Sequence, residues 1–113
     1  MHEVALMQET LDIALAHARR GGATRVHALT LRIGPLAGVE IDALRLAFEV
    51  ATADTPADGA ALCLEEVPIA CWCAACDRSF EPADNVFRCP QCLALSGDIR
   101  QGREFDLVAV EVS

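Results

Sequence analysis

Two pairs of cysteines in the second half of the chain have the spacing of a metal site. Cys73 and Cys76 form one Cys-x-x-Cys pair, and Cys89 and Cys92 form a second pair after twelve intervening residues. A gap of two residues lets both thiolates of a pair turn toward one ion, and two such pairs supply a tetrahedral sulfur shell. The spacing therefore predicts a closed four-thiolate site. Such a site is structural, because it leaves no open position for a substrate.

The ion that best suits four thiolates is zinc, although a rubredoxin-like iron centre accepts the same geometry. Zinc binding of this kind contributes roughly 10–16 kcal/mol of apparent free energy, so the metal would fold this segment. Cys71 stands two residues before Cys73 and offers a competing ligand. The regular pairs favour Cys73, and exchange between the two sulfurs stays open. Cys63 falls in a strand pattern and is expected to be a small core or edge residue.

A second and weaker metal motif lies at the start of the chain, where a histidine, His2, follows the initiator methionine. Its imidazole and the adjacent backbone nitrogens can close small chelate rings around a metal. Nitrogen-rich, square-planar or tetragonal ligand sets suit nickel(II) and copper(II). Glu3 and Glu40 are candidates for carboxylate ligands or for hydrogen bonds that tune the site. His17 and His27 lie in helix and strand patterns and are expected to be surface or packed side chains.

The elements that must position these residues follow from apolar periodicity. Two segments, residues 3–20 and 41–53, carry apolar stripes at helical spacing, formed by Val4, Met7, Leu11, Leu15 and Ala18 and by Ile41, Leu44, Phe48 and Ala51. Three segments have strand patterns: residues 24–33, 60–69 and 105–112. Between the last two strands the alternation stops, and cysteines and prolines take over.

This order of elements predicts an α+β fold, with two helices packed on a small three-stranded sheet and an inserted four-cysteine, zinc-ribbon-like module. The α+β domain comprises residues 1–69 together with 97–113, and the zinc-binding module comprises residues 70–96. The module is thus an insertion before the last strand.

Composition argues against several classes of function. The chain has 113 residues and a net charge of −8, and without a dense arginine cluster such a chain is repelled by nucleic-acid phosphates. No apolar run reaches the ~18 residues of a membrane helix, and the start lacks a signal-type region, so a cytoplasmic protein without a membrane partner is expected. The sequence has no His-Glu-x-x-His motif, and its three histidines are scattered. We therefore expect no enzymatic activity.

Three features together resemble the HypA/HybF family, the nickel metallochaperones of hydrogenase maturation. The first is Met1-His2-Glu3 at the start of an amphipathic helix, and the second is Arg-Ile-Gly-Pro-Leu-Ala-Gly-Val-Glu over residues 32–40. The third is the combination of Cys-Trp-Cys-Ala-Ala-Cys over residues 71–76 with Cys-Pro-Gln-Cys over residues 89–92. The resemblance covers nearly the whole chain in the right order.

The resemblance implies that nickel(II) is bound as cargo by His2 and neighbouring backbone nitrogens, which include those of Glu3, with help from Glu40. The α+β domain is then the nickel-binding domain. A structural zinc ion is held by the four cysteines of the paired motifs, Cys73, Cys76, Cys89 and Cys92. Cys71 is additional to this pattern.

The resemblance also implies partners. Family members pass nickel to the large subunit of nickel–iron hydrogenase together with a nickel-binding maturation GTPase, and some also serve urease maturation. The alternative is a zinc-ribbon protein-interaction module without nickel delivery, which would leave the N-terminal motif unused. An iron–thiolate electron carrier is a further alternative, for which the purified protein would be red.

Overall fold

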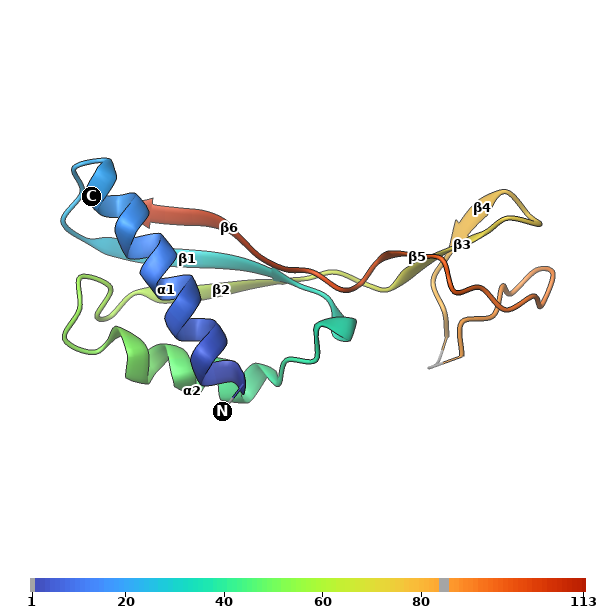
Figure 1. Ribbon diagram of the computed structural model, residues 1–113, viewed down its shortest axis with the longest axis horizontal. Coiled ribbons are helices and arrows are strands. Elements are labelled where there is room, and N and C mark those ends of the chain that lie inside the picture. Colours follow the sequence, from blue (N-terminus) through green and yellow to red (C-terminus); the bar gives the residue numbers. More distant parts are fainter. Residues whose placement is uncertain (1, 84–85) are drawn as a thin grey trace. The chain divides into compact units, whose positions relative to one another are not determined.

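The computed structural model describes residues 2–83 and 86–113. Within these ranges the helices are α1 (His2–Arg20), the short 3-10 helix η1 (Pro35–Ala37) and α2 (Ile41–Thr52). The strands are β1 (Val26–Ile33), β2 (Ala61–Glu66), β3 (Ala70–Cys73), β4 (Arg78–Phe80), β5 (Ile99–Gln101) and β6 (Phe105–Val112). Figure 1 follows these elements along the chain. None of the described helices is both long enough and apolar enough to span a membrane.

The chain divides into two compact units. Unit 1 consists of residues up to Arg32, Gly38–Glu65 and Asp106–Ser113, and unit 2 consists of Ile33–Ala37 and Glu66–Phe105. The predicted zinc module, residues 70–96, lies within unit 2. Unit 2 extends beyond it because β5 pairs with β3, and residues that follow the module are thereby held in the same unit.

Unit 1 contains a three-stranded sheet in the order β2-β1-β6. The end of β6 meets the start of β1, where the Ser113 N–H donates to the Arg25 carbonyl at 3.0 Å, so these strands are antiparallel. β2 runs parallel to β1. The N–H of Val26, at the start of β1, donates to the carbonyl of Pro56, which precedes β2, and Arg32 near the end of β1 pairs with Glu65 near the end of β2. Helix α2 makes the crossover that a parallel pair requires.

The core of unit 1 is supplied by both helices and the central strand. Its largest fully buried side chains are Met7, Leu11, Val26, Leu29, Leu31 and Leu44. Figure 1 shows α1 crossing the strands of this sheet. The expected α+β fold, with two helices on a small three-stranded sheet, is thus confirmed.

The buried stripe of each helix is turned slightly from the predicted one. Val4, which we expected to face the core, is 48% exposed, whereas Thr10 and Ala14 are buried. The Thr10 hydroxyl donates to the Leu6 carbonyl at 2.8 Å, so its burial leaves no polar atom unpaired. In α2, Ala47 is buried beside Leu44 and Phe48. The prediction for Val4 was wrong because spacing alone does not show where the neighbouring helix lies.

Unit 2 contains a second sheet, in the order β4-β3-β5, built from three very short strands. All its pairings are antiparallel: Cys71 lies opposite Phe80 on β4 and opposite Ile99 on β5. The sequence pattern indicated only a turn-rich segment with a hairpin here, because strands of three or four residues are too short for a detectable alternation.

Candidate metal centre

The first cysteine pair is positioned by the β3–β4 hairpin. Cys73 is the last residue of β3 and pairs with Arg78, the first residue of β4, so Cys76 lies in the turn between them. Asp77, directly after Cys76, has a positive φ of 52°. Aspartate tolerates this left-handed conformation better than most residues. The backbone thus reverses immediately after the second cysteine and turns both side chains to the same side.

The second pair is built in the same way. The Leu93 N–H donates to the Cys89 carbonyl and the Cys89 N–H donates to the Ala94 carbonyl, each at 2.9 Å, which closes a tight loop around the pair. Leu93 follows Cys92 and has a positive φ of 64°. For a leucine this conformation costs roughly 1–2 kcal/mol, so the surrounding bonds must hold it in place. Both cysteine pairs therefore end in the same backbone reversal.

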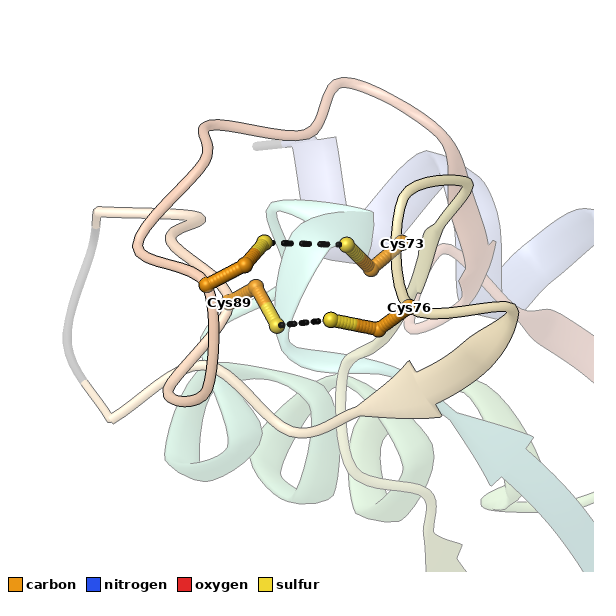
Figure 2. Close-up of side chains that lie close together, drawn as sticks. Cys73, Cys76 and Cys89 are labelled. Atoms are coloured by element: carbon orange, nitrogen blue, oxygen red, sulfur yellow. Dashed lines mark hydrogen bonds between the residues drawn. The ribbon is translucent and has the colours of Figure 1, made fainter.

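The four sulfur atoms form a cluster of the right size for one ion. All four lie within 4.8 Å of one another, with 3.5 Å between Cys73 and Cys92 and 3.9 Å between Cys76 and Cys89. Four thiolates about 2.3 Å from a zinc ion would have sulfur–sulfur edges of about 3.8 Å. Figure 2 shows Cys76 facing Cys89, with Cys73 beside them. The donor set and its dimensions fit a structural zinc ion, as the spacing predicted.

Local hydrogen bonds prepare this cluster for a cation. The backbone N–H groups of Cys92 and Gln91 lower the pKa of the Cys89 thiol to about 6, which favours the thiolate that a metal ion binds. A hydrogen bond with Cys92, together with burial, raises the pKa of Cys76 to about 12. A bound dication overrides such differences and deprotonates coordinating thiols.

Cys71 is not part of the sulfur cluster. Its side chain is fully buried in the core of unit 2 with Cys73, Phe80 and Cys89, and Ile99 packs against this group. Burial raises the pKa of the Cys71 thiol. The structure therefore assigns Cys71 to the core of the module. Cys63, the remaining cysteine, is exposed on β2, at the edge of the other sheet.

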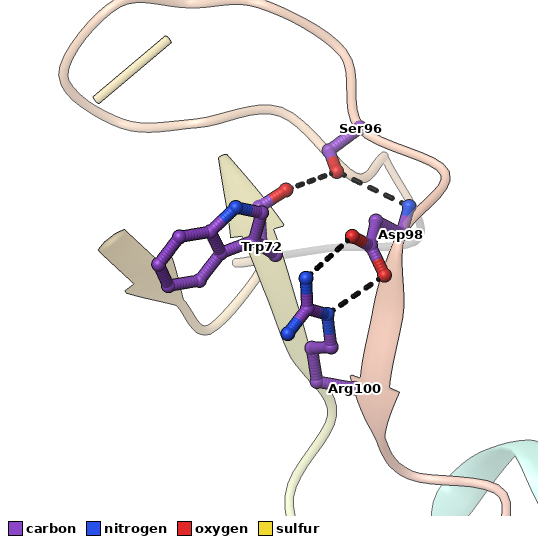
Figure 3. Close-up of polar contacts among 4 residues, drawn as sticks. All are labelled: Trp72, Ser96, Asp98 and Arg100. Carbon is purple, nitrogen blue, oxygen red and sulfur yellow. Dashed lines mark hydrogen bonds and ion pairs between the residues drawn. The ribbon is translucent and has the colours of Figure 1, made fainter. Parts of the chain in front are cut away.

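A polar network ties β3 to β5 beside the cluster (Figure 3). The Ser96 hydroxyl donates to the Trp72 carbonyl, and the Trp72 N–H donates to the Asp98 carbonyl at 2.9 Å. Arg100 forms a two-pronged ion pair with Asp98 at 2.8 and 2.9 Å, and its guanidinium carbon lies 5.0 Å from the centre of the Trp72 ring. Sequence reasoning missed this network, because Trp72 becomes a neighbour of Ser96, Asp98 and Arg100 only through the pairing of β3 with β5.

The three N-terminal candidates lie in unit 1. His2 is the exposed first residue of α1, Glu3 follows it, and Glu40 is the N-cap residue of α2. The Glu40 N–H donates to Glu3 Oε2 at 3.0 Å, while the Glu40 side chain makes no capping bond. Glu3 thus caps α2 from the neighbouring helix. This hydrogen bond, more than the nearby positive charges, lowers the pKa of the Glu3 carboxyl.

The N-terminal residues do not form a closed set of side-chain ligands. Within residues 2–83 and 86–113, the four cysteines are the one group of three or more histidine, cysteine, aspartate or glutamate side chains placed to hold an ion. The structure brings Glu3 and Glu40 together but does not complete a cage around His2. A metal held there needs donors from the backbone.

Comparison with known proteins identifies the relatives of this chain. The family model described as "Hydrogenase/urease nickel incorporation, metallochaperone, hypA" matches residues 1–112. The hydrogenase maturation factor HypA of Picosynechococcus sp. is 48% identical over 112 residues, which cover 99% of each chain. The protein of the same description from Chloroflexus aggregans is 43% identical over 112 residues, or 98% of each chain.

Two solved structures share the fold. The solution structure of the nickel metallochaperone HypA from Helicobacter pylori has a TM-score of 0.66 at 20% identity and covers 97% of this chain and 96% of that one. A second solution structure of a HypA protein has a TM-score of 0.69 at 23% identity, with coverage of 100% and 97%. At these identities the likeness concerns the fold alone.

Proposed function

Since this chain belongs to the HypA family of hydrogenase and urease nickel-incorporation metallochaperones, as its sequence features indicated, we propose that it binds Ni(II) at its N-terminus and helps insert it into the large subunit of nickel–iron hydrogenase. The ligands are the His2 imidazole and the backbone nitrogens of His2 and Glu3, with Glu3 and Glu40 beside them. Nickel is the cargo, and a zinc ion held by Cys73, Cys76, Cys89 and Cys92 is structural.

One contact carries this proposal: the 3.0 Å hydrogen bond from the Glu40 N–H to Glu3 Oε2. It holds the first turn of α1, which begins at His2, against the start of α2, where Glu40 is the N-cap residue, and acidic residues here favour a cation. In this proposal both acidic residues contribute to the site, although neither needs to be a ligand. Glu3 anchors the turn, and the Glu40 side chain has no capping role that competes with a metal.

The start of a helix suits reversible metal binding. The first four N–H groups of an α-helix have no intrahelical acceptor, and α1 begins at His2. The nitrogens of His2 and Glu3 can therefore bind nickel without the loss of any hydrogen bond of the helix. Release needs only the first turn to fray, which costs little because helix ends are the least stable part of the element.

The zinc site has the opposite character. Its four ligands come from two tight loops, so the ion cannot leave without unfolding the module. Such a site suits the presentation of a fixed surface rather than exchange. We propose that this module helps position the partners, which are the maturation GTPase, the hydrogenase large subunit and, as the family description suggests, urease maturation proteins.

The experiment that tests nickel binding is native mass spectrometry of the untagged protein before and after addition of one equivalent of nickel. We expect one retained zinc, one added nickel, and loss of the nickel alone in His2→Ala. The matched control is His17→Ala, a histidine further along the same helix. Nickel binding that survives in His2→Ala would show that His2 is not the ligand, and no specific nickel binding in the unchanged protein would leave a zinc-ribbon interaction module.

Delivery is tested in cells by the nickel content and activity of hydrogenase. We expect His2→Ala to lower both, and Cys73→Ser to lower both even if the purified variant still binds nickel. Full hydrogenase maturation with Cys73→Ser would show that the zinc module has no role in delivery.

A further inference from the structure

An apolar groove runs between the two helices of unit 1. Its volume is about 300 Å³, and it is lined by Val4 and Gln8 of α1 and by Ala43, Leu46, Ala47 and Val50 of α2. The lining residues of α2 recur at intervals of three and four, so the groove follows one face of that helix. Alanines form part of this face and leave room for the side chains of another element.

Large apolar side chains stand exposed along this groove. Val4 is 48% exposed, Leu46 is 62% exposed and Val50 is 70% exposed. Single exposed apolar residues are common on soluble proteins, but several around one hollow mark a site of interaction. The buried face of α1 is rotated away from Val4, so Val4 lines this groove instead of packing in the core.

Carboxylates border the groove on both helices. Asp42 and Glu49 lie four residues before and three residues after Leu46, which places them beside it on the surface of α2. On α1, Asp12 accepts a hydrogen bond of 3.0 Å from Gln8, and Glu3 itself lines the groove. The one arginine of α2, Arg45, instead donates to the Leu62 carbonyl. The border of the groove is therefore acidic.

We propose that this groove docks an amphipathic helix of a partner protein, one that carries an apolar ridge flanked by arginine or lysine. An apolar ridge at i, i+3, i+4 and i+7 matches the groove, and basic flanks complement its border. The face from Ala43 to Val50 is about 10 Å long at 1.5 Å per residue, so the docked segment needs about two to three turns. This docking does not depend on nickel.

The charges disfavour two other occupants. A second copy of the chain in a two-fold contact would bring the same acidic borders against each other, and like charges at an interface cost affinity. The surface of an anionic membrane would be repelled by the same carboxylates. A basic helix is the occupant that gains from both the apolar floor and the acidic border.

The test uses the zinc-loaded full chain, isotope-labelled for NMR, and two synthetic helical peptides of about 14 residues, which are cross-linked to hold the helix. Both peptides carry the same leucine ridge, flanked by arginines in one and by glutamates in the other. We expect the basic peptide to shift amide signals of α1 and α2 along the groove and to bind at least about tenfold more tightly than the acidic one. Its affinity should fall with added salt.

Two sets of variants locate the site. Leu46→Ser combined with Val50→Ser should weaken the basic peptide by about tenfold or more, and both positions are exposed enough to spare the fold. The matched control is Ile13→Ser on α1, an apolar residue of similar exposure (56%) that does not line the groove, and it should change nothing. Asp42→Lys combined with Glu49→Lys should shift the preference toward the acidic peptide.

The proposal is overturned if both peptides bind equally, if neither binds, or if binding is unaffected by the changes at Leu46 and Val50. Analytical sedimentation of the free protein tests whether a second copy of the chain occupies the groove. A dimer that dissociates in the Leu46→Ser, Val50→Ser variant would show that a second copy fills the groove and would also overturn the proposal.

Discussion

At the scale of single residues, Cys71 and Cys73 illustrate how position along a short strand separates two chemically identical side chains. Both lie on β3 and both are buried. Cys73 ends the strand next to the turn that carries Cys76, whereas Cys71 lies opposite Phe80 and Ile99. Two residues along a strand amount to about 6.6 Å of backbone, so Cys71 cannot join the same four-sulfur shell without a shift of the strand.

We therefore predict that Cys73→Ser loses the zinc ion while Cys71→Ala keeps one zinc per chain. Cys71→Ala should lower the free energy of unfolding of the module by about 1 kcal/mol, because it removes a buried side-chain atom. Zinc per chain is measured by elemental analysis after exhaustive dialysis. Zinc loss in Cys71→Ala as complete as that in Cys73→Ser would reassign the ligand.

Glu3 gives a second prediction at this scale. Its pKa is lowered from 4.5, chiefly by the Glu40 N–H, so its stabilising effect is fully present above pH 4.5 and is lost as the pH falls through the lower pKa of the folded state. Glu3→Gln should therefore melt below the unchanged protein at about pH 7, and the gap should close toward about pH 3. Far-UV circular dichroism follows the melting of α1 and α2.

The control for this prediction is Glu9→Gln, an exposed glutamate on the same helix. Zinc loss in acid lowers the melting temperatures of the unchanged protein and of both variants alike. Only the difference in melting temperature between them therefore reports the effect of Glu3. A gap that is unchanged or widens toward acid pH would contradict the capping role of the carboxylate.

At the scale of elements, the segment after β1 is fastened to the segment before β6. The Gly34 N–H donates to the Glu104 carbonyl at 2.9 Å, and the Leu36 N–H donates to the Gly102 carbonyl at 2.8 Å. A Cβ atom added at Gly34 would overlap the carbonyl oxygen and carbon of Gly102. Only glycine fits at position 34. The close backbone contact, and not only the turn at the end of β1, therefore explains why a glycine precedes Pro35.

We predict that Gly34→Ala destabilises unit 2 by about 1–3 kcal/mol or more, since the obstacle is backbone that cannot rotate away. Gly97→Ala is the matched control, because a Cβ at that position meets nothing within 4 Å. Both variants are compared by thermal denaturation of the zinc-loaded protein. The fluorescence of Trp72, which is the one tryptophan of the chain and lies in unit 2, is the signal. Equal melting temperatures for the two variants would disprove the close contact.

At the scale of the whole molecule, the two units depend on different forces. Unit 1 has a conventional apolar core of methionine, leucine, valine and phenylalanine side chains from two helices and a strand. The buried core of unit 2 consists of Cys71, Cys73, Cys89 and Phe80, and so has few apolar atoms of its own. A core that small cannot offset the conformational entropy of the roughly 45 residues of unit 2, so a metal ion bound by the four cysteines would have to supply the difference.

We predict that a strong zinc chelator unfolds unit 2 and leaves unit 1 largely intact. Both α-helices belong to unit 1, so the far-UV circular dichroism of the helices should change little. Hydrogen-exchange protection in β3, β4 and β5 should disappear, and the environment of Trp72 should change. Loss of helical signal in step with loss of the β3 protection would show that the units fold as one.

Short-range patterns in the sequence determined the parts of this protein that depend on short-range physics. Helical periodicity located α1 and α2 within one or two residues, and strand alternation located β1 and β6. Two Cys-x-x-Cys pairs identified the four sulfurs of the candidate metal centre, because such a pair turns both thiolates inward by local geometry alone. The combination of motifs also identified the family, which the comparisons confirmed.

Tertiary structure decided everything that depends on residues far apart in the chain. The burial of Cys71, the close approach of Gly34 to Gly102 and the inclusion of β5 in unit 2 result from the pairing of distant segments, which no local spacing encodes. The bond between Glu3 and Glu40 and the groove at Val4 result from the way α1 and α2 pack. Periodicity shows that a helix has an apolar face, but only the position of its neighbour decides which edge of that face is buried and which edge stays open to a partner.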